Sequence, residues 1–224
     1  MKIRLMILLF AVSPGAFAQA PWFYGGDFDG RGFLESGKST AIEDARVYDN
    51  FQNDVHEAEI DWVFGNFLVD GPLPTQLYYE FRQGVEPGNG GELLHSGTVA
   101  ATAVETLRGG FGMLEWHVRG DVPRIELAQG HTWFMAAPVG NGTGHYYLST
   151  TSGRSGVGSP LGDGNSYYDS ETFGANFDPT SDWLGKGTWD FSVGFGNDLI
   201  PEPATLLATL AGLGLLAFRK RRRG

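Results

Sequence analysis

The chain of 224 residues carries a net charge of −10 and contains no cysteine. The lack of cysteine excludes a disulfide scaffold and a cysteine-ligated zinc site, and the negative charge disfavours binding to nucleic acid. Its 34 glycines follow no regular period, and its 16 phenylalanines, 8 tyrosines and 6 tryptophans are too many for a disordered chain. Glycine-rich turns between aromatic and β-branched segments predict an all-β protein.

The beginning of the chain has the pattern of a secretory signal peptide. Lys2 and Arg4 form a short basic region, a mostly apolar run follows, and Ala16 and Ala18 precede a cleavage point before Gln19. We therefore expect an N-terminal signal helix that passes through the Sec translocon and is removed by signal peptidase. The alternative, a buried N-terminal helix, leaves the two small residues before Gln19 unexplained.

The middle of the chain consists of short apolar or alternating runs between turn signals, without a long stretch of helical period. Such spacing predicts a two-sheet antiparallel sandwich of jelly-roll or lectin-like type. The expected strands lie at residues 45–51, 59–69, 75–83, 92–105, 111–120, 124–128, 131–139, 145–151 and 188–195.

Acidic residues at 57–61 are the best catalytic candidates. Glu57, Glu59 and Asp61 alternate with apolar residues, so they would share one face of a strand. The segment is similar to the Glu-x-Asp-x-(x)-Glu strand of lectin-like glucanases, in which the first carboxylate is the nucleophile and the last the general acid. A match that starts at Glu59 puts Val63 or Phe64 at the acid position, and one that starts at Glu57 exchanges Glu and Asp. A solvated polar face is therefore the favoured interpretation.

The early segment "GGDFDGRGFLESG" partly fits a calcium-binding loop. Asp27, Asp29 and Glu35 occupy the first, third and ninth positions of such a loop, but Arg31 and Lys38 occupy ligand positions that need oxygen. A looser structural calcium ion at Asp27 and Asp29 stays open, beside a turn in which the aspartates cap backbone N–H groups. We expect no other cofactor.

Aromatic residues beside loops are the best sign of a ligand, because sugars stack on exposed aromatic rings. The candidates are Trp22, Tyr24, Tyr146, Tyr147, Tyr167 and Tyr168.

The end of the chain, "IPEPATLLATLAGLGLLAFRKRRRG", predicts a membrane tether. The segment from Ala204 to Phe218 has no charge, and as a helix its 15 residues would extend about 22 Å, a short transmembrane span. Basic residues next to a membrane span stay on the cytoplasmic side. Because both ends of the chain are basic, both are expected in the cytoplasm, and the middle of the chain is expected outside it. The basic residues after the span are Arg219, Lys220, Arg221, Arg222 and Arg223.

The motif Pro201-Glu202-Pro203, the apolar segment and the arginine-rich end together resemble the PEP-CTERM sorting signal of exported proteins in Gram-negative bacteria. The resemblance implies that an exosortase, a membrane transpeptidase, cuts near this motif and passes the body to the cell surface or extracellular matrix. The chain would then consist of a signal peptide at 1–18, a β-sandwich domain at 19–199 and a sorting signal at 200–224.

The body also resembles a β-sandwich domain that is common among PEP-CTERM proteins, through "VYDNF", "GNGGELLHSGT", "LAQGHTWFMAAPVGNGTG" and "STTSGRSGVGSP", with Gly130, Trp133 and Phe134 matching its late aromatic segment. We expect an exported, surface-sorted protein without enzymatic activity that associates with extracellular matrix or exopolysaccharide. The alternatives are a glycan-active hydrolase and a calcium-dependent carbohydrate-binding module.

Overall fold

The computed structural model describes residues 21–41 and 43–198. Contacts between Cα atoms join Pro21–Asn197 into one compact unit. The predicted signal peptide and sorting signal lie outside the described residues. Within them, no helix has the length and apolar character needed to cross a membrane.

The described residues form twelve strands and one short helix, which confirms the all-β prediction. In chain order the elements are β1 (Phe23–Tyr24), β2 (Phe28–Glu35), β3 (Gly37–Thr40), β4 (Glu43–Asp70), β5 (Gln76–Gln83), β6 (Glu92–Gly110), β7 (Met113–Pro138), β8 (His145–Thr151), β9 (Tyr167–Ser170), β10 (Ala175–Pro179), α1 (Thr180–Leu184), β11 (Asp190–Phe191) and β12 (Val193–Gly196).

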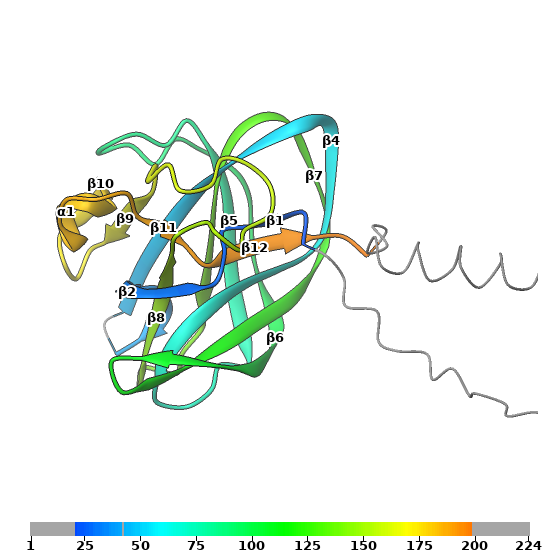
Figure 1. Cartoon of the computed structure of the whole chain (residues 1–224). Helices are drawn as coiled ribbons and strands as arrows, with labels where there is room; N and C mark the ends of the chain where they lie inside the picture. The colour runs from blue at the N-terminus through cyan, green and yellow to red at the C-terminus, as the bar shows by residue number, and fades with distance from the viewer. Residues whose placement is uncertain (1–20, 42, 199–224) are drawn as a thin grey trace, which may run out of the picture. The chain divides into compact units, whose positions relative to one another are not determined.

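Two long strands, β4 and β7, run through the whole curled sheet and pair with each other antiparallel (Figure 1). Their pairing register shifts twice, between Asn53 and Glu57 and between Ile60 and Trp62. Bulges of this kind bend a strand and increase its twist, which lets one strand belong to different parts of a sheet along its length. At the first shift, the Asn53 amide donates to the carbonyl oxygens of Leu127 and Ala128 at 3.0 and 2.9 Å, so it replaces missing ladder hydrogen bonds.

The other strands attach to this pair in an antiparallel sheet whose main order is β1-β12-β4-β7-β5-β6. Strand β8 pairs with β2, β4 and β11, and β9 joins the beginning of β4 to β10. Strand β12 lies between β1 and β4, where Gly194 is required. A Cβ atom there would lie 2.5 Å from both the Phe64 ring and the Phe23 carbonyl oxygen.

The hydrophobic core lies on one face of these strands and is dominated by aromatic rings. Alternate residues of β4 and β5 point into it, as the period-two geometry of a strand requires. The Phe195 ring lies at its centre, 4.6 Å from the ring centroid of Phe51 and 5.4 Å from that of Phe134. Both neighbours are almost fully buried, so the end of the described chain is packed into the core.

A second, smaller cluster packs on the opposite face of the sheet. It joins Tyr48 of β4 and Met135 of β7 to Phe177 of β10, with the Tyr48 and Phe177 ring centroids 5.2 Å apart. This packing holds β10 against the sheet, and β9, β10 and α1 lie together at one side of the domain (Figure 1).

The sequence predicted several strands well and others poorly. The strands expected at 75–83 and 145–151 match β5 and β8 closely. The gaps expected inside 45–69 and 111–139 are wrong, because β4 and β7 continue through bulges. The segment read as a calcium loop or turn contains strand β2, and β3, β9 and β10 were not predicted.

Candidate functional site

A polar depression of about 580 Å³ opens where the ends of β3 and β9 meet the beginning of β4 and the loop after β7. The segments come from distant parts of the chain and are held by pairing of β3 and β9 to β4. The depression is lined by Ser39, Thr40, Asp44, Arg46, Gly142, Asp169, Ser170 and Glu171.

Arg46 is the positive charge among the residues that line the depression, and three carboxylates share it. Its Nη2 donates to Asp44 at 3.0 Å, while its Nη1 lies 3.6 Å from Asp169 and 3.9 Å from Glu80. Asp169 is also the cross-strand partner of Arg46 in the β4–β9 ladder. The buried Nε of Arg46 has no hydrogen-bond partner among the described residues.

Buried Glu80 fixes the floor beneath Arg46. Its carboxylate accepts hydrogen bonds from Tyr78 Oη at 2.5 Å, Arg82 Nε at 2.6 Å and Tyr48 Oη at 2.8 Å. Burial by itself raises the pKa of Glu80, but these donors and the charge of Arg82 outweigh it and hold the pKa below its ordinary value. The carboxylate is therefore ionised and held in place, so Arg46 is positioned before any ligand arrives.

Asp169 is in the opposite situation. Burial raises its pKa, and repulsion from Glu80 and Glu171 adds to this, although Arg46 and Arg82 act in the other direction. The attraction of Arg46 and Arg82 is therefore too weak to offset the effect of burial on the pKa of Asp169.

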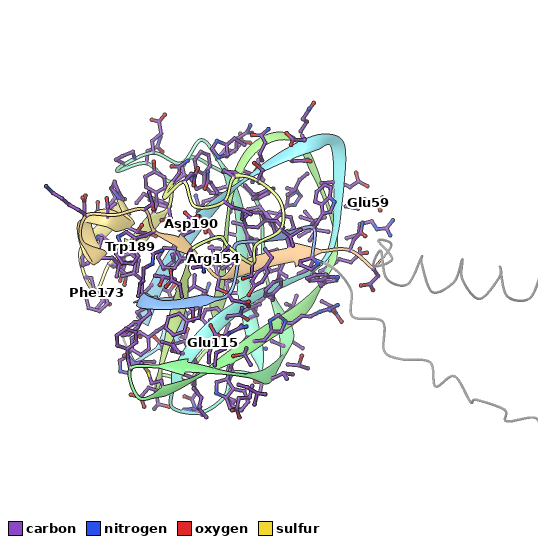
Figure 2. The ribbon with its side chains drawn as sticks, in the orientation of Figure 1. Glu59, Glu115, Arg154, Phe173, Trp189 and Asp190 are labelled. Carbon is purple, nitrogen blue, oxygen red and sulfur yellow. The ribbon has the colours of Figure 1, made fainter. Side chains whose placement is uncertain are left out.

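One aromatic ring, that of Tyr78, lies close to Arg46, and two exposed rings follow β9 and β10 along the chain. The ammonium group of Lys38 lies 3.9 Å from the ring centroid of Tyr78, so a cation already covers this ring. Phe173 follows Glu171 in the turn after β9 and is 47% exposed, and its ring lies 6.3 Å from that of exposed Trp183 on α1. Figure 2 labels Phe173 at the side of the domain formed by β9, β10 and α1. The sequence did not single out either ring.

The aromatic residues predicted to bind a ligand differ in their exposure. Tyr146 and Tyr168 are core residues with 1% and 2% exposure, so their assignment to a ligand surface is wrong. Both lie in strands whose alternation points them inward. Those that keep partial exposure are Trp22, Tyr24, Tyr147 and Tyr167.

The structure gives each candidate calcium ligand its own arginine. Asp27 accepts hydrogen bonds from Arg108 at 2.6 Å and Tyr24 at 2.7 Å. Asp29 pairs with Arg31 at 2.6 Å and accepts a hydrogen bond from Thr150. Among the described residues, no group of three acidic or histidine side chains is arranged to hold a metal ion. A calcium ion at Asp27 and Asp29 stays a prediction.

Two of the catalytic candidates, Glu59 and Asp61, both contact the same arginine side chain. Glu59 lies 3.4 Å and Asp61 3.5 Å from the half-exposed guanidinium of Arg124, while the side chain of Glu57 lies outside the described residues. Figure 2 shows Glu59 at the edge of the domain. Neither carboxylate lines the depression. Both carboxylates are partly exposed, and their shared contact with Arg124 is compatible with the polar strand face that alternation predicted.

A second buried polar network was not foreseen. Fully buried Glu115 of β7 accepts hydrogen bonds from Arg108 at 2.6 Å and Thr106 at 2.8 Å, beside the β6–β7 hairpin (Figure 2). On the same face of β7, His117 Nδ1 lies 2.9 Å from Asn66 Oδ1. Side chains alternate along a strand, so Glu115 and His117 must share a face of β7. Polar residues in alternation usually face water, so the burial of this face does not follow from the sequence.

Two further acids bind backbone groups: Asp190 binds those of the loop before β9, and Asp49 binds one in β11. Asp190 accepts hydrogen bonds from the backbone N–H groups of Gly162 and Gly164, and Asp49 accepts one from that of Phe191 at 2.7 Å. Burial raises the pKa of Asp49 well above its ordinary value, and repulsion from Asp190 raises it further. These carboxylates are engaged by backbone groups and serve the fold.

The predicted sorting and cleavage residues, Pro201–Pro203, 219–223 and those around Gln19, lie outside the described residues. Comparisons with models of protein families, with characterised proteins and with solved structures found no match for this chain.

Proposed function

We propose that the chain is an exported, surface-sorted protein without enzymatic activity, which binds polysaccharide of the extracellular matrix. Support for export comes from the basic and apolar beginning of the chain, with Ala16 and Ala18 before Gln19. Support for sorting comes from Pro201-Glu202-Pro203 and the apolar, arginine-rich end, with an exosortase as the processing partner.

The depression beside Arg46 carries the binding part of the proposal. Polysaccharides present hydroxyl groups that need planar polar partners, and the depression offers a fixed guanidinium, carboxylates and the hydroxyls of Ser39 and Ser170. Outside the lining of the depression, the exposed rings of Phe173 and Trp183 lie 6.3 Å apart and offer an apolar surface of the kind on which sugars stack. The preorganised Arg46–Glu80 pair is the observation on which this part depends.

We further propose that the curled sheet is a two-sheet sandwich of jelly-roll or lectin-like type. The bulges in β4 and β7 support this, because they allow two halves of one hydrogen-bonded sheet to face each other across the aromatic core.

A hydrolase that uses Glu57, Glu59 or Asp61 is the less favoured alternative. Retaining catalysis needs two carboxylates about 5–5.5 Å apart around a bound sugar. Both described candidates instead contact Arg124 on a partly exposed strand face.

The sorting proposal is tested by replacing Pro201-Glu202-Pro203 with three alanines in the native host. We expect the variant to stay uncut and in the membrane fraction, because the processing enzyme loses its motif. Mass spectrometry of the unaltered protein should find new ends near Gln19 and near residues 201–203. Normal release of the alanine variant would contradict the proposal.

A further inference from the structure

The charges around the depression define which polysaccharide it suits. Four ionisable side chains line it: the carboxylates of Asp44, Asp169 and Glu171 and the guanidinium of Arg46. Beneath them, the negative charge of Glu80 is matched by Arg82 at 2.6 Å. Lys38, whose ammonium group covers the Tyr78 ring, is a second cation nearby, and the three carboxylates still outnumber the two positive charges. The surface that a ligand meets is therefore negative, even though an arginine lies at its centre.

The three carboxylates are not equally available. Asp44 is used by the protein, because one oxygen accepts the Ser39 backbone N–H at 3.1 Å and the other the Arg46 guanidinium at 3.0 Å. Asp169 lies 3.6 Å from Arg46, which is longer than a charge-assisted hydrogen bond of about 2.7–2.9 Å. Glu171 is exposed in the turn after β9. A ligand can thus reach Asp169 and Glu171.

The position of Arg46 argues against an acidic sugar. A uronic acid carboxylate would be attracted by Arg46 but would lie among Asp44, Asp169 and Glu171, and like charges at close range are costly in a partly buried site. A positively charged sugar reverses this balance, because an ammonium group close to Asp169 and Glu171 supplies the missing positive charge.

We propose that the depression selects a glycan with free amino groups, such as a hexosamine polymer that lacks part of its N-acetyl groups, over neutral or acidic glycans. The sugar ammonium binds between Asp169 and Glu171, and the partly exposed guanidinium of Arg46, with the exposed hydroxyl of Ser39, is left for ring hydroxyls. This inference rests on the proposed function, namely that the depression binds polysaccharide. Burial raises the pKa of Asp169, and the long 3.6 Å contact with Arg46 does not offset this, in agreement with a carboxylate that is only weakly paired.

Isothermal titration of the full chain tests the proposal with three probes: a glucosamine tetramer, the N-acetylated tetramer of the same backbone and a uronic acid tetramer. The measurement is made at mildly acidic pH, where the sugar amine carries its charge. We expect the glucosamine tetramer to bind, and Asp169→Asn and Glu171→Gln each to weaken it by roughly tenfold or more, the usual effect of losing a charged hydrogen-bond partner.

The matched control is Glu105→Gln, which removes the same charge from an exposed position on β6 outside the depression. We expect it to leave binding unchanged, and an equal loss in this variant would overturn the proposal in favour of general attraction to an acidic protein. Thermal denaturation checks each variant, and exposed Glu171 decides the result if Asp169→Asn does not fold.

The remaining outcomes separate the two proposals. Equal binding of the N-acetylated tetramer overturns the amino-sugar selectivity and keeps the carbohydrate site. Binding of the uronic acid tetramer alone also overturns the selectivity. If no probe binds, and a broad panel of glycans gives no binding, the proposed polysaccharide function of the depression itself is wrong.

Discussion

Acid should destabilise the protein in part through His117, and the substitution His117→Gln should remove this part. Burial lowers the pKa of His117 from 6.5 to about 4, and the charges of Arg119 and Arg108 act in the same direction. The folded protein thus keeps this ring neutral at pH values where the unfolded chain protonates it. Stability contributed by the neutral ring is lost as the pH falls from 6.5 towards 4.

The size of the effect follows from the two pKa values of His117. Their difference corresponds to about 3 kcal/mol between the protonation states, of which about 2 kcal/mol is expressed between pH 7 and about pH 4.5. Glutamine at this position cannot titrate and keeps an N–H donor for Asn66 Oδ1. We therefore expect the variant to lose about 2 kcal/mol less than the unaltered protein over this range.

Urea unfolding at both pH values measures the difference. In thermal unfolding, the same free energy corresponds to roughly 4–8 °C for a domain of this size. The raised pKa values of Asp49 and Asp190 have the opposite effect, since folding then favours their protonated forms, but they are common to both proteins and cancel in the comparison. Equal losses in the two proteins would refute a neutral, buried His117.

Two further predictions concern the core and a metal ion. Phe195→Ala should lower the free energy of unfolding by about 3–5 kcal/mol in urea titrations, because its buried ring is central to the aromatic core. The control Phe111→Ala, at a ring 59% exposed, should cost much less. Similar costs for the two variants would show that the core is misplaced. Chelation by EDTA should leave the melting temperature almost unchanged, because Asp27 and Asp29 are engaged by arginines, and a large drop would reveal an ion there.

The sequence predicted strands correctly where alternation and turn signals coincide. It predicted a gap wrongly where side-chain hydrogen bonds replace the backbone hydrogen bonds between two strands. "TQLYYEFRQ" places Leu77 and Phe81 on the core face, as the structure confirms for β5. Residues 52–58, "QNDVHEA", separate two predicted strands, yet Asn53 satisfies carbonyl groups across the bulge and the strand continues. Single-strand patterns contain no information on such a contact between distant segments.

The depression could not be predicted from the sequence, because its residues come from separate strands. Arg46, Glu80 and Asp169 lie on three strands, and only pairing of β9 with β4 brings the first and last together. One local signal was available, since Glu80 and Arg82 are two residues apart and must share a face of β5. That signal predicts an ion pair on the strand, but not the tyrosines that bury it or the cavity above it.

The position of β12 has a consequence for any processing of the chain. Because Val193–Gly196 is hydrogen-bonded to β1 on one side and to β4 on the other, this strand is an internal part of the sheet. A protease that cut upstream of Gly196 would withdraw Phe195 and leave two neighbouring strands unpaired. The shortest product that preserves the fold therefore ends after Gly196, and a cut at residues 201–203 releases a body whose last strand is already locked in place.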